Sequence, residues 1–219
     1  PSKDNSIYSY SVNNEAPLLT GLQATLPEVK AGESLIISSS DLLQGFTDAE
    51  GDTLNVGNVW TDYGVWTLLL ALLLGALQTR QQWTLSRWSE ASLLWIAFWV
   101  LGFGGVYGFI MHLVFGTFSA EQIGWPNSPF QYEVAYANLM IGILGYSSFL
   151  YRKRDYLLAS MVAFASWLFA DGVGHVVSLV VFKNNAASNA GAVLYTDLLT
   201  PLLVILLLWI SRDERRRLS

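Results

Sequence analysis

The residues of this chain that could do chemistry are a few ionisable side chains set in long apolar stretches. His112 and His175 are its two histidines, and Glu133, Asp171 and Asp197 are carboxylates in similarly apolar surroundings. Asp171 and His175 are four residues apart, so they share one face if the stretch is helical. Ionisable groups inside a membrane are costly and by default mark a functional site facing the interior of a helix bundle. These five residues are therefore the candidate site.

Four interpretations of this site are open. The side chains can form a hydrogen-bonded polar core that sets the register of the helices without any ligand. They can bind a metal, since two imidazoles with the carboxylates of Glu133, Asp171 and Asp197 suit zinc or non-haem iron, although no ExxH or HExxH spacing is present. His112 and His175 can be axial ligands of a haem or chlorophyll-type pigment, which requires matched depth. A proton, quinone or lipid site is the fourth.

The composition indicates that membrane helices position these side chains. Hydrophobic residues make up 53% of the 219 residues and charged residues only 13%, against about 25% charged residues in typical soluble domains. A bilayer core about 30 Å thick needs roughly 20 mostly apolar residues per helix. Five stretches are apolar nearly all round, the first of them short: residues 59–77, 91–118, 130–151, 156–182 and 193–210. The sequence predicts an all-α polytopic membrane bundle of about five transmembrane helices over residues 61–219.

These spans place the candidate residues at a similar depth in the membrane. His112 lies six residues before the end of its span, which is about 9 Å along a helix, and His175 lies about 10 Å from the end of its own. Glu133 and Asp197 enter their spans from the same side of the membrane. We therefore expect the polar residues to gather in one leaflet.

The distribution of charge predicts an orientation. Nine of the twelve basic residues fall on one side of a five-span arrangement: Arg80, Arg87, Arg152, Lys153, Arg154, Arg212, Arg215, Arg216 and Arg217. Because cytoplasmic loops carry the excess of Lys and Arg, we expect a cytoplasmic C-terminus and an extracytoplasmic N-terminus. The net charge of −5 argues against a nucleic-acid partner, and the absence of cysteine excludes cysteine-based metal and redox sites. The expected partners are the lipid bilayer and other protein subunits or copies of this chain.

Residues 1–60 have a different character from the rest. Short β-favouring runs alternate there with Gly, Asp and Asn, and the first 62 residues carry nine acidic residues but only two lysines. This pattern predicts a small, acidic, β-rich extracytoplasmic segment. The stretches NNEAPLLTG and SSSDLLQGFTDAEGDTLNV, within residues 12–57, resemble part of a cadherin-like repeat of bacterial adhesins.

That resemblance implies a β-sandwich fragment and calcium binding. By it, Asp48, Glu50 and Asp52 are candidate calcium ligands, and alternate carboxylates on a tight turn do offer the hard oxygen ligands that calcium prefers. A solvated acidic turn with no ion is the alternative.

The membrane half carries a second resemblance. The stretches GWPNSPFQYE, at residues 124–133, and DGVGHVV, at residues 171–177, are similar to a family of small bacterial integral membrane proteins of unknown function, over residues 64–210. The resemblance implies a compact helical bundle in the inner membrane of a bacterial cell, and no particular reaction. We therefore expect a non-enzymatic accessory or scaffold subunit of a membrane assembly. A membrane redox protein or metalloenzyme that uses the His/Glu/Asp cluster is the alternative.

Prolines and glycines predict how the spans begin and pack. Pro126 and Pro129 lack amide donors, so no regular helix is expected before Phe130. Small residues let two helices approach closely, and they recur on the second and third spans at Gly102, Gly104, Gly105, Gly108, Gly142 and Gly145.

Overall fold

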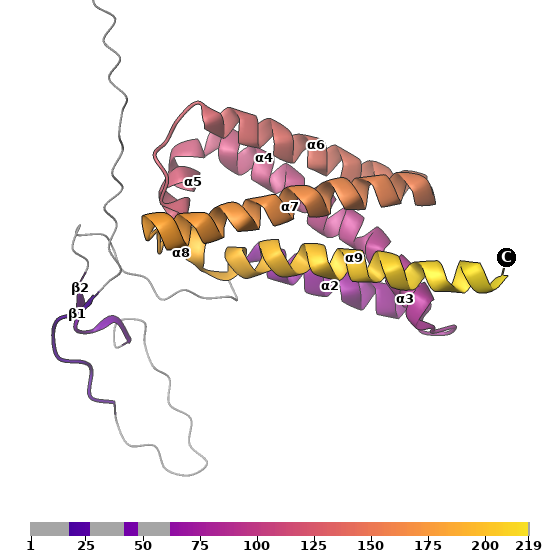
Figure 1. Ribbon diagram of the computed structural model, residues 1–219, viewed down its shortest axis with the longest axis horizontal. Coiled ribbons are helices and arrows are strands. Elements are labelled where there is room, and N and C mark those ends of the chain that lie inside the picture. Colours follow the sequence, from indigo (N-terminus) through magenta and orange to yellow (C-terminus); the bar gives the residue numbers. More distant parts are fainter. Residues whose placement is uncertain (1–17, 27–41, 48–61, 219) are drawn as a thin grey trace, which may run out of the picture.

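The structure, a computed structural model, describes residues 18–26, 42–47 and 62–218 (Figure 1). Strand β1 (Leu18–Leu19) pairs antiparallel with β2 (Phe46–Thr47), with Leu18 opposite Thr47 and Leu19 opposite Phe46. This two-stranded sheet belongs to the segment that was predicted to be β-rich. Residues 1–17, 27–41 and 48–60 of that segment, including the acidic turn at residues 48–52, lie outside the described residues.

From residue 62 onward the chain is helical. Within the described residues, four helices are long and apolar enough to cross a membrane, at Leu85–Val114, Phe130–Tyr151, Arg154–Phe182 and Ala187–Ser211. The element at Tyr63–Thr79 is apolar but shorter, with 17 residues. The individual elements are α2 (Tyr63–Thr79), α3 (Leu85–Ile96), η2 (Ala97–Phe103), α4 (Gly104–Val114), α5 (Gly116–Ile123), α6 (Phe130–Tyr151), α7 (Arg154–Phe182), α8 (Ala187–Ala190) and α9 (Ala192–Leu218).

Three of the predicted spans match the observed helices closely. The span at residues 130–151 coincides with α6, which begins directly after Pro129 as the proline pattern predicts. The spans at 156–182 and 193–210 fall within α7 and α9.

The predicted span at residues 91–118 is wrong at its C-terminal end. The helix stops at Val114, Phe115 leaves the helical conformation, and α5 begins at Gly116. Phe115 and Phe118 continue the apolar pattern across this break, so hydropathy does not reveal it. His112 therefore lies two residues, or about 3 Å, before the end of α4 rather than about 9 Å before the end of a longer span.

The close approach predicted from small residues is confirmed. A Cβ atom added to Gly105 would collide with the backbone of Gly142, and one added to Gly145 would collide with the backbone of Gly102. These contacts bring η2 and α4 against α6. On the other side of the bundle α7 packs chiefly against α9, and α3 packs against α2 and α9.

The apolar core occupies one half of the bundle. It includes Leu93, Leu101, Met161, Val204 and Leu207, all fully or almost fully buried. Figure 1 shows the α2–α3 connection, the α6–α7 connection and the C-terminal end of α9 at one end of the bundle, with α5 and α8 at the other. The connections that carry most of the basic residues therefore share one end, which is called the basic end below.

An ion pair ties the basic end together. Arg154 Nη1 lies 3.6 Å from Glu90 Oε1 on α3, and Arg154 Nη2 donates a hydrogen bond to Ser211 Oγ on α9 at 2.8 Å. One side chain at the start of α7 thus joins three helices there. The opposite half of the bundle has room for a cavity.

Candidate functional site

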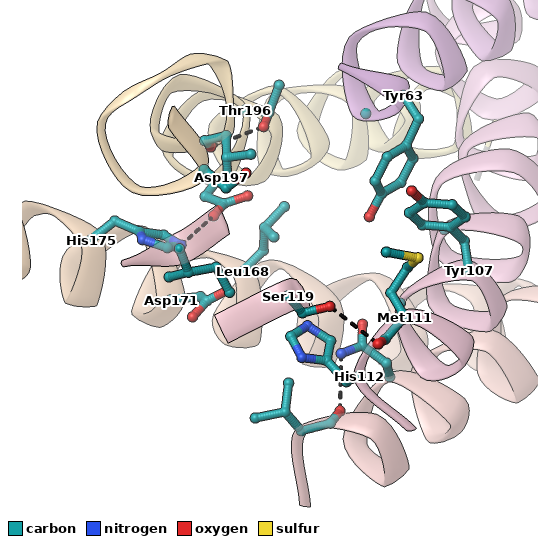
Figure 2. Close-up of a pocket in the computed structure, with 18 of the residues that line it drawn as sticks. Tyr63, Tyr107, Met111, His112, Ser119, Leu168, Asp171, His175, Thr196 and Asp197 are labelled. Carbon is teal, nitrogen blue, oxygen red and sulfur yellow. Dashed lines mark hydrogen bonds and ion pairs between the residues drawn. The ribbon is translucent and has the colours of Figure 1, made fainter. Parts of the chain in front are cut away.

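A cavity of about 1180 Å³ lies in the half of the bundle away from the basic end. All five residues of the predicted site line it: His112 on α4, Glu133 on α6, Asp171 and His175 on α7, and Asp197 on α9. Because these residues are up to 85 positions apart in the chain, the fold alone assembles them. Figure 2 shows the acidic and histidine side chains of α7 and α9 on one side of the pocket, with His112 on another.

Asp171, His175 and Asp197 form a compact group, called the carboxylate–histidine cluster below. One potential ligand atom from each of the three lies within 4.8 Å of the others. His175 Nε2 is 3.6 Å from Asp197 Oδ2, and both side chains are more than nine-tenths buried. Asp171 sits one helical turn before His175 and remains accessible from the cavity. Gly172 permits this arrangement, because a Cβ atom there would press on Leu198 and Asp197 of α9.

A buried carboxamide orients His175. Asn189 Nδ2 donates to the carbonyl oxygens of Asn184 at 2.8 Å and of His175 itself at 3.5 Å. Its Oδ1 must therefore accept from His175 Nδ1, which lies 2.8 Å away. In the neutral imidazole this arrangement leaves the lone pair on Nε2, the nitrogen that faces Asp197. That is the state in which histidine binds a metal ion.

Asp197 is incompletely satisfied. Among the described residues its buried Oδ2 has no hydrogen-bond donor, although it faces His175 Nε2 at 3.6 Å. Pro201, inside α9, has no amide hydrogen to donate to the backbone carbonyl of Asp197. Even a charged His175 would neutralise only one of the two carboxylates of the cluster. A buried carboxylate whose charge is not balanced is strongly unfavourable. The two carboxylates of the cluster therefore require a bound cation or a proton.

The α5–α6 connection covers His175. The Trp125 ring stacks on the imidazole with centroids 6.0 Å apart and an angle of 22° between the planes. Asn184 holds this connection in place, because its Nδ2 donates to Ile123 O at 2.8 Å and to Ser178 Oγ at 3.1 Å. Lys183 adopts a left-handed conformation, with φ of 56°, and turns the chain so that Asn184 is buried. The stretch GWPNSP therefore forms part of a cap over the cluster.

Sequence reasoning missed the roles of Asn184 and Asn189. Both lie in the short connection NNAASNA between two apolar spans, where polar residues are ordinary. They are nevertheless almost completely buried. Three asparagines within six residues at a helix connection are the one signal that could have indicated them.

His112 and Glu133 line the cavity but do not belong to the carboxylate–histidine cluster. His112 Nδ1 lies 2.6 Å from Oε1 of Gln131, a buried residue in the first turn of α6. Of the predicted metal ligands in the membrane half, Asp171 and Asp197 therefore come together with His175. Asp48, Glu50 and Asp52 lie outside the described residues, and a calcium site there stays a prediction from sequence.

The chain matches no curated protein and no solved structure. A family model described as a family of unknown function, DUF6790, matches residues 61–217. The matched range begins just before α2 and contains every residue that lines the cavity. Residues 12–57 precede this range, and their resemblance to an adhesin repeat stays a prediction from sequence. The cavity and its cluster are thus part of a membrane-type helical bundle that belongs to the DUF6790 family, a family of unknown function.

Proposed function

We propose that this chain is an integral membrane protein that binds a divalent transition-metal ion in its cavity, as a membrane metalloenzyme or redox protein does. The convergence of Asp171, His175 and Asp197 around an unsatisfied, buried Asp197 Oδ2 carries this proposal. A divalent cation would balance the two carboxylates and remove the unfavourable charge. One imidazole nitrogen with two carboxylate oxygens suits zinc, iron(II) or manganese better than calcium or magnesium, which prefer oxygen ligands only.

The surroundings of the cluster fit a functional metal site. Asn189 holds the ring nitrogen of His175 that faces away from the cluster, which is the usual way in which proteins orient a metal-binding histidine. Asp171 is accessible from the cavity, so a metal ion bound by the cluster would keep open coordination positions that face the cavity. Catalytic metal sites keep such an open position, whereas structural sites are closed by protein ligands.

Metal analysis of the purified full chain tests this proposal. We expect about one equivalent of zinc, iron or manganese per chain, since three protein ligands suffice for a site with an open position. Asp197→Asn and His175→Gln should abolish binding. Asp155→Asn is the matched control, because Asp155 lies on α7, like Asp171, but at the basic end. A metal-free chain whose thermal stability does not respond to added zinc, iron(II) or manganese would refute the metal site.

The second candidate is the non-enzymatic accessory or scaffold subunit expected from the sequence. The observation that favours it is that each histidine already has a carboxamide partner, Gln131 for His112 and Asn189 for His175. A hydrogen-bonded polar network of this kind can serve packing alone. The metal-free outcome described above would favour this candidate.

The proposed orientation places the cavity in the outer half of the bilayer. It is supported by the basic connections at the other end of the bundle, which by the charge rule face the cytoplasm. In this arrangement α2 is a fifth crossing, and the acidic N-terminal segment is extracytoplasmic. A bacterial inner membrane is the proposed location.

A further inference from the structure

We propose that the part of the cavity beyond the carboxylate–histidine cluster binds the amine or quaternary ammonium headgroup of a membrane amphiphile. The inference rests on the proposed function, because it assigns Asp171, His175 and Asp197 to the metal ion. It names the class of organic ligand that the remaining space accepts. Size, charge, aromatic geometry and access each contribute to the argument.

The volume of the cavity is large enough for an organic ligand. Typical small-molecule sites occupy roughly 300–1,000 Å³. The cavity here, at about 1180 Å³, is larger, and it extends from α2 and α4 across to α7 and α9. A single metal ion with its ligands fills only a small part of such a volume.

The charge of the lining selects the headgroup. Four carboxylates line the cavity, those of Asp62, Glu133, Asp171 and Asp197, and among the described residues that line it there is no lysine or arginine. A divalent ion in the cluster balances Asp171 and Asp197. Asp62 and Glu133 then keep the remainder of the cavity negative, which attracts a cation and repels a phosphate or carboxylate headgroup.

An aromatic pair lies in this remaining part. The rings of Tyr63 on α2 and Tyr107 on α4 have centroids 4.4 Å apart and planes inclined by 52°. Figure 2 shows both tyrosines across the pocket from Asp197 and His175. Tyrosine ring faces attract organic cations, and proteins recognise quaternary ammonium groups by enclosing them in several aromatic rings. Asp62 directly precedes Tyr63 in the chain.

The rim of the cavity indicates entry from the bilayer. Tyr107 on α4 and Trp167 on α7 both line the cavity, and each is also 38% exposed. Tyr107 and Trp167 lie on helices with different main packing partners. Helix α4 packs chiefly against α6, and α7 packs chiefly against α9. An apolar rim within helices long enough to span a membrane suits a ligand that carries an alkyl chain.

Binding of matched alkyl probes tests the inference. The full chain in nanodiscs of an uncharged glycolipid is titrated with dodecyltrimethylammonium and with dodecyl sulfate, by calorimetry. We expect saturable binding of the ammonium probe, about tenfold or more tighter than the sulfate, because cation–π and charge contributions of this size are typical of partly desolvated sites. Tyr107→Leu and Glu133→Gln should each weaken binding of the ammonium probe, whereas Tyr107→Phe, which keeps the ring, should retain most of it.

Two controls keep the outcomes separate. Tyr151→Leu removes a ring from a similar tyrosine pair, Tyr151 with Tyr156, located where α6 meets α7 at the basic end, and it should leave binding unchanged. Metal content is measured on the same samples and should not change in Tyr107→Leu. Equal affinity for the two probes would overturn this inference, as would ammonium binding by Tyr107→Leu as tight as by the wild type. In either case, a bound metal ion would still support the proposed function. A metal-free chain with Tyr107-dependent ammonium binding would support the headgroup site and overturn the metal site alone.

Discussion

At the scale of single residues, Asn189 has more influence on the site than its position in a connection suggests. Its side chain is fully buried and bonds to the ring of His175 and to the backbone of Asn184 at the same time. It therefore couples the orientation of the imidazole to the cap that covers it. The chemistry of His175 depends on this contact, because the proton on Nδ1 determines that Nε2 carries the lone pair.

Asn189→Ala should weaken the metal site and the fold together. We expect metal affinity to fall by about 10–100-fold, the usual effect of removing a group that orients a ligand. The lost hydrogen bonds should also lower the free energy of unfolding by about 1–2 kcal/mol. Metal titration and thermal unfolding of the purified protein measure the two effects.

Asn185→Ala is the matched control for this prediction. Asn185 lies in the same connection and is exposed, and its Nδ2 donates a hydrogen bond to Lys183 O at 2.9 Å. Its replacement should change neither quantity. If Asn189→Ala also left metal affinity unchanged, the proposed orientation of His175 would be wrong.

At the scale of elements, the contact of η2 and α4 with α6 decides where the site forms. Helix association in a membrane relies on van der Waals packing, since lipid tails are as apolar as the helix surfaces. Glycines on both sides of this contact allow the backbones to meet. The contact places α4, which carries His112, against α6, which carries Gln131 and Glu133. The other wall depends on Gly172, where α7 and α9 approach each other.

Gly105→Leu should separate α4 from α6. Even the Cβ atom of the new side chain would collide with the backbone around Asn138 and Gly142, so a leucine forces the helices apart. We expect a loss of about 1–3 kcal/mol or more in the free energy of unfolding, as overpacked cores show. Gly174→Ala is the control, because nothing lies within 4 Å of a Cβ atom at Gly174 on α7. Similar stability of both variants in a detergent unfolding assay would contradict the tight contact.

At the scale of the whole molecule, the bundle has two chemically different ends. The basic connections and the Arg154–Glu90 ion pair lie at one end. The acidic cavity and its asparagine-rich cap lie toward the other. The basic residues thus concentrate at one end of the helices, as they do on the cytoplasmic side of membrane proteins. This distribution is the basis of the orientation proposed above.

Cysteine labelling tests this orientation directly, because the chain contains no cysteine. Ser128→Cys lies in the exposed α5–α6 connection and Gln81→Cys in the exposed α2–α3 connection, so the helix at Leu85–Val114 separates them. In intact bacterial cells, a membrane-impermeant maleimide should label Ser128→Cys. Gln81→Cys should react only after the membrane is permeabilised. The reverse pattern would place the cavity on the cytoplasmic side, and labelling of both in intact cells would show that this helix does not separate them.

Much of the fold follows from local patterns. Long apolar stretches make helices obligatory in a bilayer, since every backbone polar group must be satisfied within the segment. Pro129 set the start of α6, and the glycines of the second and third spans predicted their contact. Hydropathy did not place the break at Phe115, because Phe115 and Phe118 extend the apolar run beyond it, and the break depends on how α5 folds back over the cavity.

The sequence by itself determined that this chain is a membrane-type helical bundle, and which ionisable residues stand out in it. Only the tertiary structure decided that Asp197 joins the pair Asp171 and His175 in one cluster while His112 and Glu133 face other parts of the cavity. The physical reason is that hydropathy and spacing act along one helix at a time. The partners of a buried carboxylate depend on how neighbouring helices rotate and approach, and here glycine contacts, a proline in α9 and two buried asparagines determine that arrangement.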